Sequence, residues 1–205
     1  MKVDLHVHTA ERSRCGRAMA VDQIEAARAA GLDAIVLTDH ARFAPEEDLA
    51  DWNRQFAPFR VFGGIEMSVD GEDLIVLGVR EPRLESDAWT YPELHACVRA
   101  AGGFLALAHP FRYRDHVAVD LARWPVDAVE VRSGNTPPQA ADRIEAMARE
   151  LGIPTLCNSD AHEPTALGRF YNRLDRTPRD EADLIALLRA GRFRGVADGA
   201  GSLGS

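Results

Sequence analysis

Three ionisable side chains share one face of a short strand predicted at the start of the chain. Asp4, His6 and His8 alternate with valine and leucine, and side chains along a strand point alternately to its two faces. Burying a carboxylate beside two imidazoles is costly unless a partner binds them. Two imidazoles at alternate residues near a strand end can supply two ligands of a metal site. The alternative is a polar edge strand whose histidines contact only water.

Metal-ligating residue types recur where later strands are predicted to end. The sequence has seven histidines, and five of them fall at such positions together with two carboxylates. The resulting candidate ligands are His6, His8, His40, Glu66, His109, Asp160 and His162. The other two histidines, His95 in a predicted helix and His116 in a predicted loop, are expected to have no role in a site.

This set of candidate ligands is too rich for one ion. A catalytic zinc usually takes three protein ligands and keeps one position open, so we expect two or three divalent ions. A carboxylate such as Glu66 or Asp160 can bridge two ions. Paired ions about 3.5–4 Å apart are a device for phosphate-ester hydrolysis, in which a bridging hydroxide attacks. Mixed imidazole and carboxylate ligation favours zinc, manganese or iron, with magnesium as a further option.

Alternating strands and helices are expected to position these groups. The predicted strands cover residues 4–10, 33–38, 60–67, 72–79, 104–110, 126–131 and 154–162, with a closing strand at 193–196. The predicted helices cover residues 21–30, 91–101, 139–151 and 180–190, and residues 44–59 are expected to be helical in part. This order predicts a parallel sheet with right-handed crossovers. Because ligands follow at least five different strands, a closed barrel would gather them at one mouth. We therefore predict a (β/α) barrel with fewer than eight strands.

Length and composition predict one soluble globular domain. A chain of 205 residues with 46% hydrophobic and 27% charged residues suffices for one core. We expect this domain to span residues 1–198 and a flexible tail to follow over 199–205. The net charge of -8 makes long nucleic acid and anionic membranes poor partners. A small anionic substrate stays compatible, because bound metals create a local positive field.

Cysteine usage and hydropathy point to the cytoplasm. The three cysteines form no CxxC pair, which suits a reducing compartment. No apolar run reaches the length of a membrane-spanning helix, and the start of the chain does not resemble a signal peptide. The sequence gives no expectation for the oligomeric state.

Five motifs, in order along nearly the whole chain, resemble the PHP (polymerase and histidinol phosphatase) family. They are Asp4-x-His6-x-His8, Thr38-Asp39-His40, Gly64-x-Glu66, His109-Pro110 and Ser159-Asp160-Ala161-His162. The resemblance implies a distorted seven-stranded (β/α) barrel, TIM-like in plan, that holds up to three divalent metals and hydrolyses phosphate esters.

The resemblance also implies an allocation of ligands. His6, His8, Glu66 and Asp160 would hold the first ion. Glu66 would bridge to a second ion held with His109, and His40 with His162 would hold the third.

Two positions depart from the family pattern. Cys15 stands in the loop where many members carry an aspartate or histidine. It could ligate as a thiolate, since a nearby metal lowers the pKa of a thiol, or it could be a bystander. Ile75 stands where many members have a histidine on the fourth strand, so the second ion would lose one protein ligand.

Residues that contact a substrate are inferred from their place after strand ends. Phosphate is well matched by guanidinium groups, and Arg17 and Arg132 are our preferred pair, ahead of Arg42 and Arg112. Asp39 would either orient an imidazole or protonate the leaving oxygen. Asp4, Asn135 and Asn158 are further candidates for orienting the ligands.

The favoured function is hydrolysis of a small phosphate ester, either a phosphomonoester or a nucleotide. One alternative is an amidohydrolase that cleaves a carbon–nitrogen bond. Such barrels usually bridge their metals with a lysine, whereas the single lysine here, Lys2, lies too early in its strand. The other alternative is a metal-binding module without catalysis. Loops 41–58 and 111–124 are the expected determinants of substrate specificity.

Overall fold

A single nine-stranded sheet forms the centre of the molecule. The structure is a computed structural model that describes residues 1–86 and 88–197. The strands are β1 Lys2–Val7, β2 Ala34–Leu37, β3 Arg60–Val69, β4 Glu72–Leu77, β5 Phe104–Leu107, β6 Ala128–Arg132, β7 Thr155–Cys157, β8 Phe170–Leu174 and β9 Phe193–Ala197. The tail predicted over residues 199–205 lies outside the described residues.

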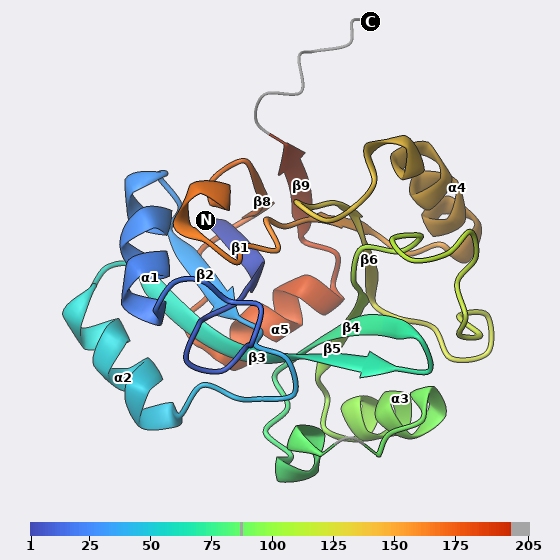
Figure 1. Ribbon diagram of the computed structural model, residues 1–205, viewed down its shortest axis with the longest axis horizontal. Helices are drawn as coiled ribbons and strands as arrows, with labels where there is room; N and C mark the ends of the chain where they lie inside the picture. Colours follow the sequence, from blue (N-terminus) through green and yellow to red (C-terminus); the bar gives the residue numbers. More distant parts are fainter. Residues whose placement is uncertain (87, 198–205) are drawn as a thin grey trace, which may run out of the picture.

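Five α-helices accompany the described strands. They are α1 Ala20–Ala29, α2 Glu46–Gln55, α3 Tyr91–Ala100, α4 Ala141–Leu151 and α5 Glu181–Arg189. Short 3-10 turns occur at η1 Pro82–Glu85, η2 Pro138–Ala140 and η3 Pro164–Ala166. In Figure 1, α1, α2, α3 and α4 lie at the periphery, whereas α5 lies at the centre of the view. Among the described helices, none combines the length and the apolar character needed to cross a membrane.

The strand order is β7-β6-β5-β4-β3-β2-β1-β8-β9. The pairs β1–β2, β2–β3, β5–β6 and β6–β7 are parallel, as crossover helices require. Strand β4 is antiparallel to both β3 and β5, and the Asp70-Gly71 turn makes β3 and β4 a hairpin. Strands β8 and β9 are also antiparallel to their neighbours. The predicted α/β barrel class is confirmed. The described residues form nine strands, one more than the seven strands and the closing strand expected, and the additional strand is β8.

Side chains, rather than a backbone ladder, join β7 to the far edge of the sheet. Asn172 on β8 accepts a hydrogen bond from the Cys157 amide at 3.1 Å and donates one to the Cys157 carbonyl at 2.8 Å. Gly195 on β9 lies so close that an added Cβ would come within 2.7 Å of the Cys157 sulfur. The sheet therefore curls into a nearly closed barrel.

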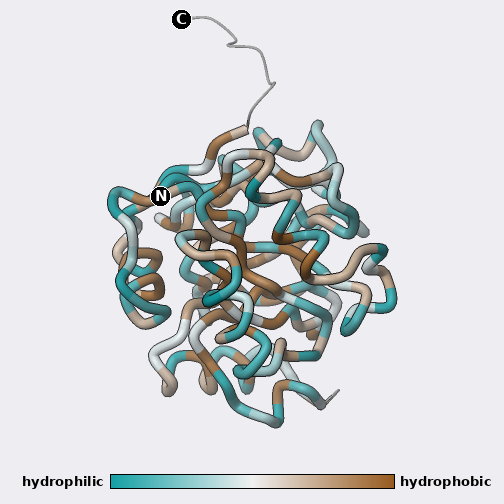
Figure 2. Tube along the Cα trace, turned by 90° about the vertical axis from the view of Figure 1, so that its left-hand side faces the viewer, coloured by the Kyte–Doolittle hydropathy of each residue, from teal (hydrophilic) through white to brown (hydrophobic). Residues whose placement is uncertain are grey.

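Apolar side chains fill the barrel and the layer between its strands and helices. Every residue of β2 is buried, as expected for a strand covered on both faces. Leu184 and Leu188 of α5 join the same buried cluster as Leu5 and Phe104, so α5 packs against residues of several strands. Hydrophobic segments run mainly through the centre of the trace in Figure 2, and hydrophilic segments lie mostly at its periphery.

Candidate metal centre

The seven candidate ligands named from the sequence come together at the carboxyl ends of the parallel strands. We call them the histidine–carboxylate cluster: His6, His8, His40, Glu66, His109, Asp160 and His162. His6 lies within β1 and Glu66 within β3, whereas the other five follow the ends of strands. The side chains of His6 and His8 are 0% exposed and that of Glu66 is 1% exposed, so the centre of the cluster is sealed from bulk water.

Glu66 touches four imidazoles. Its Oε1 atom lies 3.3 Å from His6 Nε2 and 3.2 Å from His109 Nε2. Its Oε2 atom lies 3.2 Å from His8 Nε2 and 3.0 Å from His40 Nδ1. A carboxylate whose two oxygens face different imidazoles has the arrangement that a bridge between two cations needs.

Asp160 completes the centre from the segment that follows β7 and lies beside β1. Its Oδ1 atom lies 3.4 Å from His6 Nε2 and 3.2 Å from His8 Nε2. The backbone at Asp160 and at His109 has a positive φ, 52° and 24° respectively, which is strained for residues with a side chain. This backbone also explains why the strands predicted to run to residues 110 and 162 end earlier, at Leu107 and Cys157.

The deeper imidazoles are held so that one nitrogen stays available. His6 donates from Nδ1 to Glu130 Oε1 at 3.2 Å, and His162 donates from Nδ1 to the Asp160 carbonyl at 2.9 Å. His8 places Nδ1 3.3 Å from Ser13 Oγ. In each ring Nε2 is therefore free to ligate, and such hydrogen bonds are what orient imidazole ligands in metal sites.

Two buried oxygens of the cluster lack a hydrogen-bond donor. Among the described residues, Glu66 Oε2 and Asp160 Oδ1 have no hydrogen-bond partner, although buried polar atoms are nearly always paired. Both oxygens face Nε2 of His8. A cation between them would satisfy the oxygens and the imidazole together, so the donor set fits a divalent metal.

Charge coupling within the cluster is strong. Burial alone lowers the pKa of His8, but the close carboxylates of Asp160 and Glu66 raise it overall to about 9. Burial raises the pKa of Glu66, yet His6 and His109 together hold it well below its usual range. In the metal-free protein the imidazoles therefore carry protons, and a metal ion must displace these protons in order to bind.

The structure groups the donors into sets that could each hold one ion. The sets are His6–His8–Glu66, His6–His109–Asp160, Glu66–Asp73–His109 and His8–Cys15–His40–His162, with donor atoms within 4.8 Å of one another in each. The first set lies within the expected first site, and the third contains Glu66 and His109 of the expected second site. The last contains His40 and His162, which were expected to hold a third ion, together with His8 and Cys15. Burial is the main cause that raises the pKa of the Cys15 thiol.

Asp39 is engaged by residues of the loop that follows β1. It accepts hydrogen bonds from Thr9 N at 2.6 Å, Thr9 Oγ1 at 2.7 Å and Ser13 Oγ at 2.7 Å. Ser13 in turn accepts from the His40 amide at 3.0 Å. Of the two roles foreseen for Asp39, this geometry fits the orienting one.

The two arginines preferred from the sequence lie in different hollows. Arg17 lines an open hollow of about 540 Å³ beside Cys15 and His162. Arg112 lines the same hollow and places Nη1 3.8 Å from Asp160 Oδ2. Arg132 instead lines a neighbouring hollow with Arg169. Arg17 and Arg112 are therefore the pair that the structure brings to the cluster.

The three further orienting candidates all contact the site's surroundings. Asp4 accepts from the amides of His6 and Ser159, and its burial raises its pKa to about 7. Asn135 donates to Asp160 Oδ2 at 2.6 Å. Asn158 donates to Glu130 Oε1 at 2.8 Å.

Three residues near the cluster were not singled out from the sequence as part of the site. They are Glu130, Ser13 and Asp73. Glu130 carried the clearest signal, because it is an ionisable residue between two valines of a predicted strand. The two histidines set aside lie elsewhere: His116 pairs with Asp115 at the surface, and His95 contacts the Pro125 carbonyl.

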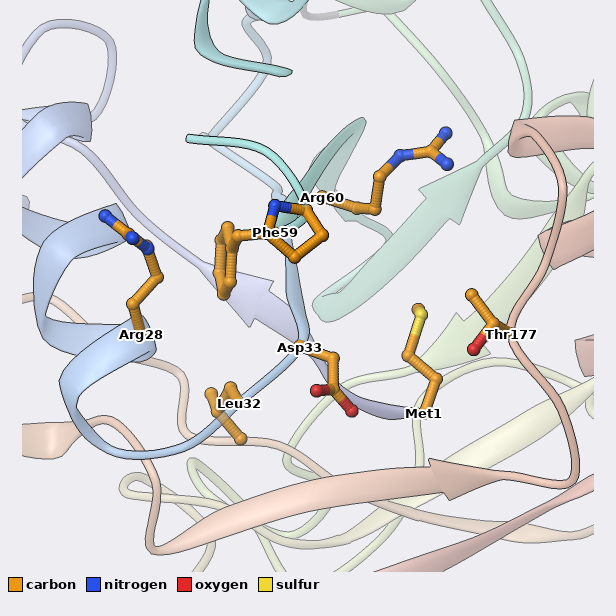
Figure 3. A pocket seen from close by; sticks show the side chains of 8 residues that line it. Met1, Arg28, Leu32, Asp33, Phe59, Arg60 and Thr177 are labelled. Carbon is orange, nitrogen blue, oxygen red and sulfur yellow. The ribbon is translucent and has the colours of Figure 1, made fainter. Parts of the chain in front are cut away.

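A second hollow lies at the opposite ends of the strands. Its volume is about 430 Å³, and Arg28, Asp33, Phe59 and Arg60 are among the side chains around it. Figure 3 shows these side chains at the ends where β2 and β3 begin. None of the cluster residues lines it, so it is separate from the candidate metal centre.

The chain is similar to several known proteins. Residues 138–193 match the family described as PHP_C, PHP-associated. PsfC from Pseudomonas syringae has a similar structure over 97% of this chain and 91% of that protein, with 23% identity and a TM-score of 0.72. No curated protein matches the sequence.

Two further structures share the fold. One is a two-domain protein from Bacteroides vulgatus, described as containing a predicted PHP-like metal-dependent phosphoesterase, with 17% identity and a TM-score of 0.71. The match covers 96% of this chain but only 64% of that protein. The other is an amidohydrolase from Chromobacterium violaceum with bound sulfate, with 18% identity, a TM-score of 0.68 and coverage of 97% of this chain and 99% of that protein. The match over residues 138–193 agrees with the resemblance to the PHP family noted from the sequence motifs. The three solved structures share the fold of this chain.

Proposed function

We propose that this chain is a divalent-metal-dependent phosphoesterase that hydrolyses a small phosphorylated molecule. The observation that carries the proposal is Glu66, whose two buried oxygens face four imidazoles. Divalent ions held there would polarise a phosphoryl oxygen and supply a nucleophile from water at neutral pH. The proposal treats residues 1–198 as one catalytic domain.

Three groups of residues would each hold one metal ion. His6, His8, Glu66 and Asp160 would hold the first ion, and Glu66 with His109 the second. His40, His162 and the Cys15 thiolate would hold a third ion at the edge of the open hollow. Zinc, manganese or iron suits these donors.

The arginines that line the open hollow would bind and orient the substrate. Arg17 is 77% exposed and makes only a 4.0 Å contact to Glu163, so it is free to meet a phosphate. Arg112 is 30% exposed beside Asp160. The sulfate bound to the Chromobacterium violaceum protein is a tetrahedral anion of similar shape to phosphate, which supports an anionic substrate.

The cytoplasm is the proposed place of action. All three cysteines, which lie in the described part of the chain, are free thiols, and this state suits a reducing compartment.

Hydrolysis of a carbon–nitrogen bond is the second candidate, because one structural relative is called an amidohydrolase. The usual bridging lysine has no counterpart here. Lys2 begins β1 and places its ammonium 5.4 Å from the centre of the Tyr171 ring. Glu66 would take the bridging place instead, and this favours the phosphoesterase.

The test is turnover by the full chain loaded with Mn²⁺ or Zn²⁺. We expect release of phosphate from aryl phosphates or nucleoside monophosphates, and loss of that release in His6→Ala. His116→Ala is the matched control, since His116 is 67% exposed and pairs only with Asp115. Full metal occupancy without turnover on phosphate esters, but with turnover on amides or lactams, would overturn the proposal.

A further inference from the structure

The fourth strand does not supply the ligand that the family pattern places there. Ile75 lies opposite Glu66 in the β3–β4 ladder. Its side chain is 0% exposed and belongs to the same apolar cluster as Leu77 and Phe104. With Ile75 in this position, the second ion is left with Glu66 and His109 alone.

Asp73 lies two residues earlier on the same strand. Residues two apart in a strand share a face, so Asp73 projects from the same side of β4 as Ile75. Its Oδ2 atom lies 3.9 Å from His109 Nε2, and its side chain is 11% exposed. Glu66, Asp73 and His109 each offer a donor atom, and these atoms lie within 4.8 Å of one another.

Two contacts fix Asp73 in this position. The Ser68 hydroxyl donates a hydrogen bond to Asp73 Oδ1, and this leaves Oδ2 directed to His109. The Asp73 carbonyl accepts from the amide of Ala108 at 2.9 Å. Because Ala108 directly precedes His109, the backbone of β4 is tied to the loop that carries the imidazole.

We propose that Asp73 is the third protein ligand of the second metal ion and replaces the histidine that Ile75 cannot supply. The inference rests on the proposed function in assuming that the cluster binds metal. Two carboxylates and one imidazole form a harder donor set than one carboxylate and two imidazoles. Harder donors favour Mn²⁺, Fe²⁺ or Mg²⁺ over Zn²⁺ relative to imidazole. The ratio of Mn²⁺ affinity to Zn²⁺ affinity is therefore higher at the second site than at a site with a histidine at this place.

Metal stoichiometry and spectroscopy of the full chain test the inference without any substrate. We expect the wild-type protein to bind Mn²⁺ at adjacent sites, with an exchange-coupled electron paramagnetic resonance signal transmitted through Glu66. Asp73→Ala and Asp73→Asn should lose this coupling and weaken binding of the second ion at least about tenfold, as loss of a metal-site group does. The first ion should stay bound, because none of its ligands changes. Asp73→His should restore the second ion and shift its preference toward Zn²⁺.

Asp127→Asn is the matched control. Asp127 is 13% exposed, pairs with Arg99 and accepts from the Leu105 amide, so its loss perturbs folding without touching the cluster. It should keep the coupled signal. Retention of both ions at wild-type affinity in Asp73→Ala, or a wild-type protein that binds a single ion, would overturn the inference. Loss of the second ion in Asp73→Ala would uphold the role of Asp73 as a ligand even if no phosphate ester were hydrolysed. Failure of this inference can therefore be told apart from failure of the proposed function.

Discussion

Glu130 accepts a hydrogen bond from His6, with 3.2 Å between Oε1 and Nδ1, and both side chains are fully buried. The second carboxylate oxygen of Glu130 accepts from the His109 amide at 3.0 Å. A single residue of β6 therefore sets the tautomer of one imidazole and fixes the backbone of another. Neither contact places Glu130 among the ligands; it is a positioning residue.

Replacing Glu130 by glutamine should weaken the first metal site. The amide keeps the size of the carboxylate but offers one acceptor where two are used. We expect the affinity for the first ion to fall by about 10- to 100-fold, the usual effect of losing such a hydrogen bond. Isothermal titration with Mn²⁺ measures it. Glu145→Gln, at a half-buried position of α4 outside the histidine–carboxylate cluster, is the control. An unchanged affinity in Glu130→Gln would contradict this assignment.

Removing the hydrogen bonds by which Asn172 closes the barrel should lower the free energy of unfolding. Asn172→Leu is close in volume but leaves the Cys157 amide and carbonyl without their present partners. Unpaired buried polar groups cost about 1–3 kcal/mol each, so the free energy of unfolding should fall by at least about that amount. Urea unfolding followed by circular dichroism measures the change. Arg173→Ala, at the adjacent exposed position of β8, should change it little.

The ligand positions were predictable because local pattern determines them. A buried strand appears in the sequence as a run of apolar residues, and a polar residue at its carboxyl end indicates the mouth of a barrel. His40 and His109 show this clearly, since each follows a four-residue strand with every residue buried. The helices were predictable for a related reason, because their apolar spacing and terminal glycines are local signals.

The features that the sequence did not reveal depend on distant partners. Strand β8 contains a buried asparagine beside an exposed arginine, and nothing local indicates that Asn172 pairs with β7. The place of Arg132 was missed for a similar reason. The register shifts between Glu130 and Arg132, and such an irregularity turns the following side chain away from the face that alternation predicts.

Once the metals are removed, the stability of the protein should decrease as pH rises. In the metal-free protein the pKa of His8 is raised from 6.5 to about 9. Stability from this raised pKa is fully present below pH 6.5 and is lost as pH rises through about 9. We expect the melting temperature of EDTA-treated protein to fall over that interval, measured by differential scanning fluorimetry. His8→Gln should flatten the fall and His116→Gln should not; an equal fall in both would refute the assignment to His8.

Zinc binding should protect Cys15 from alkylation. Cys15 is exposed, and its sulfur lies in the same donor set as His8, His40 and His162. A thiolate held by a metal is a poor nucleophile toward iodoacetamide, so labelling should slow at least about tenfold when Zn²⁺ is bound. Peptide mapping by mass spectrometry measures each cysteine separately. Cys157 is an internal control, because burial raises its pKa to about 12 and keeps it unreactive in both states. His162→Ala should remove the protection, whereas an unchanged labelling rate for Cys15 in the zinc-loaded protein would make this thiol a bystander.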